Sequence, residues 1–415
     1  MNSSLRSHAE TIVSKAVSAV LPEVPVREAL SGMTFPGRIF IVAVGKAAFR
    51  MAEAACSVLG SRVEKGVVVT KYGHVYGSIP GVACFEAGHP VPDANSFRAA
   101  QAAVDLVSGL TSSDTVLFLL SGGGSALFEL PLVPYGELES ITEQLLSCGA
   151  SITEINTVRK RLSAVKAGRF ALLSAPARIE TIALSDIPGG GPDMIASGPT
   201  CPDPTTSEDA LRVVAKYGLR LSENALELIK KETPKELSNA NITVFGGVSE
   251  LVRAAAAACR ELGYEPFILT DRLSCEAREA GSFLASIVKT HSRPDRPLAF
   301  IAGGETVVHL TGSGVGGRNQ ELALSAAIGI SGIKNAAVFS FGSDGTDGPT
   351  EAAGGYADGD TLSELAAHGI SAFAALADND SHTALKKAGG LIVTGPTGTN
   401  VNDAAVALIA ADTRN

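Results

Sequence analysis

The chain has 415 residues, of which 45% are hydrophobic and 19% are charged. These proportions are typical of globular domains and exclude a largely disordered chain, and the length predicts two or three domains at about 100–200 residues each. The 34 Lys and Arg against 43 Asp and Glu give a net charge of −9, which excludes a global positive field for nucleic acid or an anionic membrane. Any anionic ligand must therefore be held by a local basic cluster.

The six cysteines are scattered, with no C-x-x-C pair and no Cys/His cluster at metal-ligand spacing. We expect them to be reduced thiols. The N-terminal segment is polar and has no signal-peptide pattern, and no run of about 18 apolar residues predicts a membrane span. The expected location is the cytoplasm.

Short β-branched runs alternate with Ala- and Leu-rich segments of helical period through the first half of the chain. Such alternation is typical of parallel sheets that are covered by helices. We therefore predict an α/β fold whose N-terminal domain is a doubly wound, Rossmann-like parallel sheet. The predicted strands are 38–44, 66–70, 115–120 and 179–184, and the predicted helices are 45–59, 95–108, 136–148 and 153–173.

A polar, proline-containing segment at 233–241 predicts a domain boundary, with residues 1–236 in the first domain and 237–415 in a second, C-terminal α/β domain. The alternation resumes after it, and no short repeat suggests a solenoid. The predicted strands of the second half are 242–245, 265–269, 298–302, 306–310 and 336–341, and the predicted helices are 249–262, 274–290, 319–330 and 402–411.

Glycine-rich and polar segments follow several predicted strands, at the ends where open α/β sheets bind ligands. One of them follows the strand 115–120 and lets successive backbone N–H groups approach an anion without obstruction by Cβ atoms. A tight turn chosen for packing explains one or two glycines but not three between two serines. We therefore interpret this loop as an anion-binding loop; its residues are Ser121, Gly122, Gly123, Gly124 and Ser125.

Lys46 lies at the turn after the first predicted strand, where its ammonium could neutralise a phosphate or a carboxylate. Ala47 occupies the position of the Ser or Thr that meets Mg²⁺ in a Walker A loop, so that motif is excluded. The alternative is an ordinary solvated lysine.

The segment 156–169 carries five basic and no acidic residues. On a continuous helix, Asn156, Arg159, Ser163 and Lys166 would share one stripe that could clamp a polyanion such as a nucleotide phosphate chain. The alternative is a solvated helix face.

Residues 312–317 match G-x-G-x-x-G, but no acidic residue follows at the distance that a dinucleotide site requires. A simple anion-binding turn before Arg318 fits equally well.

Two further loops carry paired aspartates, which serve either as Mg²⁺ ligands beside a phosphate or as turn residues. His89 is a candidate general base that should be tested, although a structural role is more usual for such a histidine. The paired aspartates are Asp186 with Asp193 and Asp344 with Asp347.

Taken together, the motifs of this chain resemble those of the glycerate 2-kinase family, which carries a MOFRL domain at its C-terminus and includes members named hydroxypyruvate reductases. The resemblance spans nearly the whole chain in order. It rests on GKAA (45–48), GHPVPD (88–93), SGGGSAL (121–127), INTVRKRLSAVKAGR (155–169), SDIPGG with IASGPT, GGET, GGRNQE (316–321) and SDGTDGPT (343–350).

The resemblance implies phosphorylation of D-glycerate to 2-phosphoglycerate with ATP and Mg²⁺, in a cleft between two α/β domains. It implies that Lys46 and Arg318 are the catalytic cations, leaving their division of roles open. The glycine-rich loop, Arg159, Lys166 and Asn319 become candidates for substrate and phosphate binding, and the four aspartates for Mg²⁺. The implied partners are D-glycerate and ATP, without nucleic acid or membrane, and a homodimer is left open.

One segment departs from the family pattern: relatives often read S-D-V-x-G-D-D/P, with acidic residues after the glycine, whereas this chain has Gly189, Gly190 and Gly191. If those acids help to hold Mg²⁺, Asp186 or Asp193 must replace them. Two other functions remain as alternatives: an NAD(P)H-dependent hydroxypyruvate reductase that uses residues 312–317, and a non-catalytic sensor of a sugar acid or nucleotide. The presence of both cations argues against the sensor.

Overall fold

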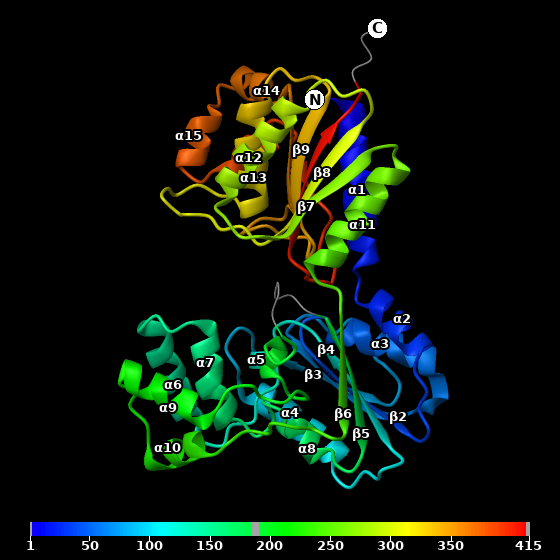
Figure 1. Ribbon diagram of the computed structural model, residues 1–415, viewed down its shortest axis with the longest axis vertical. Helices are drawn as coiled ribbons and strands as arrows, with labels where there is room; N and C mark the ends of the chain where they lie inside the picture. The colour runs from blue at the N-terminus through cyan, green and yellow to red at the C-terminus, as the bar shows by residue number, and fades with distance from the viewer. Residues whose placement is uncertain (1, 185–190, 412–415) are drawn as a thin grey trace. The chain divides into compact units, whose positions relative to one another are not determined.

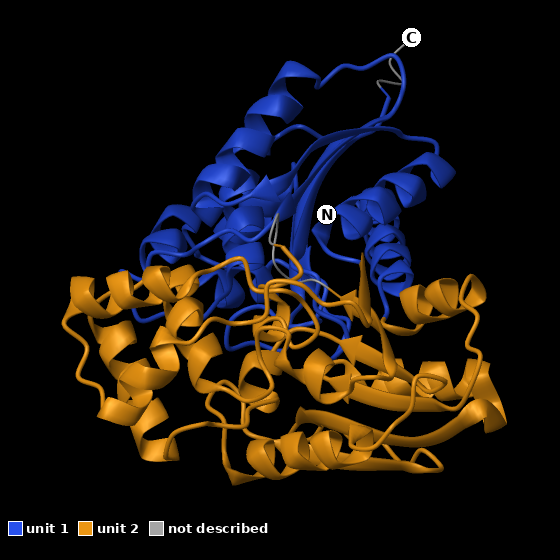
Figure 2. Cartoon of the chain, turned by 60° about the horizontal axis from the view of Figure 1, so that its bottom comes forward, with its two compact units in different colours: residues 1–21, 246–415 blue, residues 22–245 orange. Residues whose placement is uncertain are grey.

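The computed structural model describes residues 2–184 and 191–411, and the chain forms two compact α/β units (Figures 1 and 2). Unit 1 contains residues 1–21 and 246–415, and unit 2 contains residues 22–245. This division differs from the expected boundary after residue 236 in two respects. The N-terminal helix belongs to the C-terminal unit, and the strand that follows the polar segment 233–241 belongs to the first sheet.

The sheet of unit 2 has six parallel strands in the order β3-β2-β1-β4-β5-β6. This is the order of a doubly wound sheet, in which β2 and β3 are added on one side of β1 and the later strands on the other side, beginning with β4. The predicted parallel sheet is therefore confirmed. Its strands are β1 (Ile39–Val44), β2 (Val63–Lys71), β3 (Val82–Ala87), β4 (Thr115–Leu120), β5 (Arg178–Leu184) and β6 (Ala240–Phe245).

The central strands β1 and β4 are fully buried, and all their residues except Thr115 are apolar because both faces of the sheet are covered. Ile39, Ile41 and Ala43 pack on one face beneath α3 (Ala48–Leu59), whereas the intervening residues of β1 pack on the other face beneath α4 (Ala94–Val107). The two apolar layers fix the register of the central strands and hence the loops at their carboxyl ends.

The remaining helices of unit 2 include a cluster of four, α6, α7, α9 and α10, that share an apolar core of their own (Figure 1). The 3₁₀ turns of this unit are η1 (Gly60–Arg62), η2 (Lys160–Leu162) and η3 (Ile195–Ser197). Its other helices are α2 (Glu23–Ser31), α5 (Gly124–Leu127), α6 (Tyr135–Ser147), α7 (Ile152–Arg159), α8 (Arg169–Leu173), α9 (Ser207–Tyr217) and α10 (Glu223–Lys230).

The prediction of one helix over 153–173 is wrong, because α7 ends at Arg159 and α8 begins only at Arg169. Between them, Ser163 is extended, and the backbone around it bonds to residues 130–132. These bonds run from Leu132 N to Leu162 O at 2.8 Å and from Ala164 N to Leu130 O at 2.8 Å. The chain therefore leaves the helix to pair with a distant segment.

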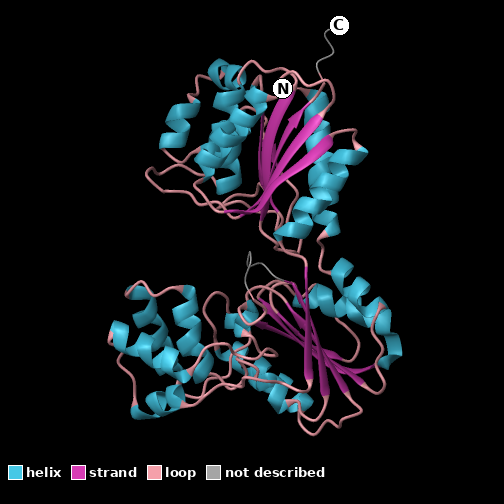
Figure 3. Ribbon diagram, viewed as in Figure 1, coloured by secondary structure: helices cyan, strands magenta, loops and turns pink. Residues whose placement is uncertain are grey.

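Unit 1 contains a mixed six-stranded sheet in the order β11-β10-β9-β12-β8-β7, with helices on both faces (Figure 3). β12 is antiparallel to both of its neighbours, β8 and β9. The strands are β7 (Glu265–Leu273), β8 (Leu298–Gly304), β9 (Ala336–Gly342), β10 (Gly354–Asp358), β11 (Leu391–Ile392) and β12 (Asp403–Ile409). The helices are α1 (Ser3–Ala19), α11 (Val248–Glu261), α12 (Ala277–Thr290), α13 (Arg318–Ile330), α14 (Thr361–Ala367), α15 (Ala372–Ala377) and α16 (Ser381–Lys387).

Two predictions for this unit are wrong. The segment 402–411 is not a helix, because it enters the sheet as β12, a central strand whose residues are all buried. The segment 306–310 is not a strand, because β7 and β12 already occupy both sides of β8. That segment makes a single bridge, from Val307 to Glu276.

No helix in the part of the chain that the structure describes is long and apolar enough to cross a membrane.

All six cysteines are free, as predicted from their scattered positions. Cys201 and Cys259 are buried, and burial raises the pKa of each thiol to about 12. These two thiols are therefore packing residues rather than nucleophiles.

Candidate active site

In unit 2, the loops that follow β1 and β4 are bonded to each other at the carboxyl edge of the sheet. Lys46 N donates to Gly122 O at 2.9 Å, and Ser121 N donates to Val44 O at 2.9 Å. The Ser121 hydroxyl accepts from Ala47 N at 3.1 Å. The structure thus brings together Lys46 and the glycine-rich loop, which the sequence predicts separately.

Two glycines make this approach possible. Gly45 has φ of +121°, and a Cβ atom there would lie 2.3 Å from the Ser121 hydroxyl. Gly123 has φ of +87°, and a Cβ atom there would lie 3.1 Å from the His89 ring and 3.2 Å from Lys46 Cγ. Any other residue would be strained at both positions and would push these groups apart.

The backbone amides of the glycine-rich loop remain available. Within the described residues, the N–H groups of Gly122, Gly123 and Gly124 have no backbone or side-chain acceptor. Successive amides of this kind form a concave site for an anion. Lys46 is half-buried, and no described carboxylate lies within ion-pair distance of its ammonium.

His89 contacts the same loop but is uncharged at neutral pH. Its burial, and secondarily the charge of Lys46, lower the pKa of His89 to about 4. The His89 imidazole therefore adds no positive charge beside the loop, whereas the Lys46 ammonium does. A neutral imidazole with so low a pKa is also a weak general base.

The predicted stripe of Asn156, Arg159, Ser163 and Lys166 does not form, because the helix ends at Arg159. Lys166 is fully buried, 2.8 Å from Glu129, and Arg159 lies 3.7 Å from the same carboxylate. Burial, only partly offset by Glu129, lowers the pKa of Lys166. The Lys166 side chain is therefore paired inside unit 2 and does not reach solvent.

In unit 1, Arg318 begins α13 and is held by two carboxylates. Its Nε and Nη2 atoms bond to the two oxygens of Asp403, the latter at 3.0 Å, and its Nη1 lies 3.2 Å from Glu305. Burial opposes the charge of Arg318, but the hydrogen bonds and the negative charge of Asp403 raise its pKa overall. The Arg318 side chain is about one-third exposed, and its guanidinium is permanently charged.

Asp347 caps α13. One oxygen accepts from Asn319 N and Nδ2, and the other accepts from Gln320 N and Nε2, at 2.9–3.2 Å. The carboxylate is almost fully buried, and this burial raises its pKa despite the four hydrogen bonds. Asn319 is also buried and accepts from the Ser340 hydroxyl at 2.5 Å. Both residues therefore hold the helix that presents Arg318.

The other predicted metal ligands have different surroundings. Asp344 is partly exposed and accepts from Thr346 N at 3.0 Å, and a Cβ atom at Gly342 would lie 3.3 Å from Asp344 and 3.4 Å from Asp403. Asp193 is paired with Lys160, and Asp186 lies outside the described residues. Across the described ranges, no three His, Cys, Asp or Glu side chains gather as a metal site.

The loop 312–317 is packed against its own chain, which explains its glycines. Cβ atoms at Gly312, Gly314 and Gly316 would lie 2.1–2.4 Å from atoms of residues 378, 380 and 381. The amides of Gly312 and Gly314 already donate within the chain, and the first amides of α13 donate to Asp347. The amides at 312–315 are therefore already occupied, and the loop does not favour the dinucleotide alternative.

The sequence reasoning missed Asp403 and Glu305 as partners of Arg318. Glu305 lies in the GGET motif and directly follows β8, so its position after a strand was an available signal. Asp403 lies in an alanine-rich segment with helical character, and only the insertion of β12 between β8 and β9 places it beside Arg318.

The fold defines a class of protein with two α/β units. One unit carries Lys46 beside the glycine-rich loop, and the other carries Arg318 held by Asp403 and Glu305. Residues 8–230 match the family described as a domain of unknown function, DUF4147, and residues 298–403 match the MOFRL family. The first match includes Lys46 and the glycine-rich loop, and the second includes Arg318.

Curated relatives specify the family further. The chain is 53% identical to the D-glycerate 2-kinase of Thermotoga maritima, over 98% of this chain and 99% of the relative. It is 43% identical to the glycerate 2-kinase of Pyrococcus horikoshii, over 90% of this chain and 88% of the relative. The crystal structure of glycerate kinase from T. maritima superposes with a TM-score of 0.95, over 98% of this chain and 99% of that one. The chain belongs to the glycerate 2-kinase family.

Proposed function

We propose that the protein transfers the γ-phosphoryl group of ATP to the 2-hydroxyl of D-glycerate, giving 2-phosphoglycerate and ADP. The observation that carries this proposal is the glycine-rich loop, whose backbone amides have no acceptor within the described residues. The Lys46 ammonium lies beside this loop, and no described carboxylate pairs with it. Phosphoryl transfer requires positioning and charge neutralisation more than covalent chemistry, and this loop supplies both.

In this proposal Lys46 neutralises charge on the transferred phosphoryl group, and the amides of Gly122, Gly123 and Gly124 bind phosphate oxygens. Arg318 binds the glycerate carboxylate through the N–H groups that Asp403 and Glu305 leave available. The two carboxylates fix the guanidinium in place, so that little conformational freedom is lost when the substrate binds.

Mg²⁺ would neutralise part of the phosphate charge when it is bound with the nucleotide. It commonly takes one or two protein carboxylates together with substrate phosphates and water. Asp344, partly exposed and close to Asp403, fits this role. Asp347 does not fit it, because its oxygens already accept four hydrogen bonds.

The test compares the unsubstituted protein with Lys46→Ala in a coupled assay of ADP release, with ATP, Mg²⁺ and D-glycerate. A parallel assay follows NADH oxidation with hydroxypyruvate. We expect ADP release that depends on D-glycerate and falls by roughly 10³-fold or more in the variant. Dehydrogenase activity without ADP release would favour the reductase, and equal rates for the two proteins would remove Lys46 from the mechanism.

A further inference from the structure

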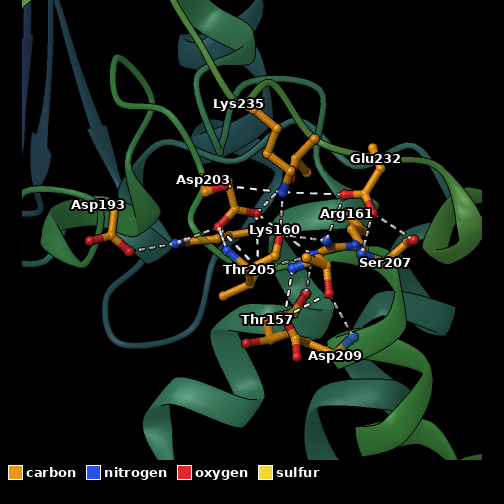
Figure 4. Close-up of polar contacts among 12 residues, drawn as sticks. Thr157, Lys160, Arg161, Asp193, Asp203, Thr205, Ser207, Asp209, Glu232 and Lys235 are labelled. Atoms are coloured by element: carbon orange, nitrogen blue, oxygen red, sulfur yellow. Dashed lines mark hydrogen bonds and ion pairs between the residues drawn. The ribbon is translucent and has the colours of Figure 1, made fainter.

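Lys160 is a buried lysine to which the proposed reaction gives no role. Its side chain is 2% exposed, and its Nζ lies 3.0 Å from Asp193 and 3.4 Å from Asp203 (Figure 4). A buried ammonium is costly unless it is paired and hydrogen-bonded. The lysine therefore connects two carboxylates, Asp193 and Asp203.

The two carboxylates differ in how they are held. Asp203 is completely buried and accepts from the Thr233 hydroxyl at 2.7 Å, from Thr205 N at 3.1 Å and from the Thr205 hydroxyl at 3.0 Å (Figure 4). It would thus keep its position without the lysine. Within the described residues, Lys160 is the side-chain partner on which Asp193 depends. Asp203 is the fixed end of this connection, and Asp193 is the end that it holds.

Asp193 supports a tight turn of unusual backbone conformation. Ala196, Ser197 and Gly198 have φ of +51°, +61° and +63°, which is the left-handed region that residues other than glycine rarely adopt. A Cβ atom at Gly198 would lie 3.0 Å from the carbonyl oxygen of Asp193, so the turn packs directly on the Asp193 backbone. Such a turn persists only where its surroundings hold it in place.

The same turn contacts the glycine-rich loop. A Cβ atom at Gly124 would lie 2.5 Å from the Ala196 Cβ, and the Ser197 hydroxyl lies 3.0 Å from the Ser125 hydroxyl. The Ser197 hydroxyl also donates to Asn156 at 3.3 Å. A displacement of the turn would therefore displace the loop whose amides face the proposed phosphate site.

We propose that Lys160 and Asp193 are a positioning pair that holds the phosphate-binding loop through the turn at 196–198. This proposal rests on the proposed function, since it takes that loop to bind the phosphates of ATP. It assigns Asp193 to the support of the loop and not to the binding of a metal ion.

The experiment compares the unsubstituted protein with Asp193→Ala and Asp193→Asn, and the latter keeps the side-chain volume should the former fail to fold. The control is Lys235→Met, which removes another lysine of this network; Lys235 Nζ donates to the Asp203 carbonyl at 3.1 Å and does not contact Asp193 (Figure 4). Amide hydrogen exchange is measured at 121–127 without substrates. The KM values for ATP and for D-glycerate are measured separately.

We expect exchange at 121–127 to accelerate and the KM for ATP to rise by about 10- to 100-fold in the Asp193 variants. The KM for D-glycerate should stay within about 2-fold, and Lys235→Met should match the unsubstituted protein. Unchanged exchange, or faster exchange with an unchanged KM for ATP, would overturn the positioning pair. Absence of phosphotransfer by the unsubstituted protein would instead contradict the proposed function, and the exchange data alone would then decide whether the pair holds the loop.

Discussion

Arg318 illustrates how charge and geometry combine at a single residue. Asp403 engages its Nε and Nη2 atoms together, a planar contact that a lysine ammonium cannot reproduce. We therefore predict that Arg318→Lys keeps the positive charge but lowers kcat/KM for D-glycerate by about 100-fold or more, measured by ADP release.

The control for this variant is Arg253→Lys, because Arg253 forms an exposed ion pair with Glu250 on the surface of α11. Surface pairs of this kind contribute little, so its kinetics should be unchanged. If Arg318→Lys were as active as the unsubstituted protein, the fixed guanidinium would have no part in substrate binding.

We predict that His89 makes the free energy of unfolding depend on pH. Its pKa of about 4 in the folded protein lies below the value of about 6.5 for an unfolded chain, so the unfolded state binds more protons between these values. The stability associated with the neutral imidazole is present above pH 6.5 and is lost as the pH falls toward 4. Urea unfolding at pH 7.5 and 5.0 should show a smaller loss of stability for His89→Gln.

The exposed His368 supplies the comparison for that measurement. His368→Gln should lose as much stability between the two pH values as the unsubstituted protein does. An equal pH dependence in His89→Gln and His368→Gln would contradict the account of His89.

At the residue scale, the sequence predicts the groups that follow apolar strands. Lys46 and the loop 121–125 could be found because a strand followed by glycine has a recognisable pattern. Arg318 could be found from the glycine-rich turn 312–317 that precedes its helix, although the segment before that turn is not a strand. Which cations are accessible could not be predicted. Lys166 and Arg159 pair with Glu129, and that contact exists only because the helix ends early and the chain folds back.

At the scale of elements, we predict that Asp347 and Asp344, two aspartates of one loop, differ in their effects on stability and on the Mg²⁺ requirement. Asp347→Asn should lower the free energy of unfolding by about 1–3 kcal/mol, because the new amide cannot accept all four donors from α13. Asp344→Asn should change stability by less than about 0.5 kcal/mol but raise the Mg²⁺ concentration needed for activity. Urea unfolding and a Mg²⁺ titration separate the two effects.

The reverse result would reassign the loop. A raised Mg²⁺ requirement in Asp347→Asn with unchanged stability would make Asp347 a metal ligand and not a helix cap.

Most elements of both units could be predicted from hydrophobic periodicity, and the errors have physical causes. β12 reads as helical because its sequence, DAAVALI, is rich in alanine, which favours helices in isolation. Its burial between β8 and β9 overrides that preference. The break after α7 could not be predicted either, because it depends on pairing with residues 130–132.

At the scale of the whole molecule, α1 joins the C-terminal unit, where Leu5, Ile12 and Val13 are buried against α11 and the sheet. Each such side chain contributes about 1.5–3 kcal/mol when fully buried. We predict that deletion of residues 1–21 makes unit 1 sensitive to limited proteolysis while unit 2 stays resistant. Cleavage confined to residues 22–245 would contradict this division, and Ile12→Ala should show a weaker form of the expected effect.

Phosphorus NMR of the protein with ATP, Mg²⁺ and D-glycerate follows the proposed phosphoryl transfer itself. We expect growing resonances of ADP and of 2-phosphoglycerate, which fix the reaction and its regiochemistry together. A resonance of 3-phosphoglycerate would contradict the assigned position of transfer. Unchanged ATP in the presence of D-glycerate would contradict the kinase itself.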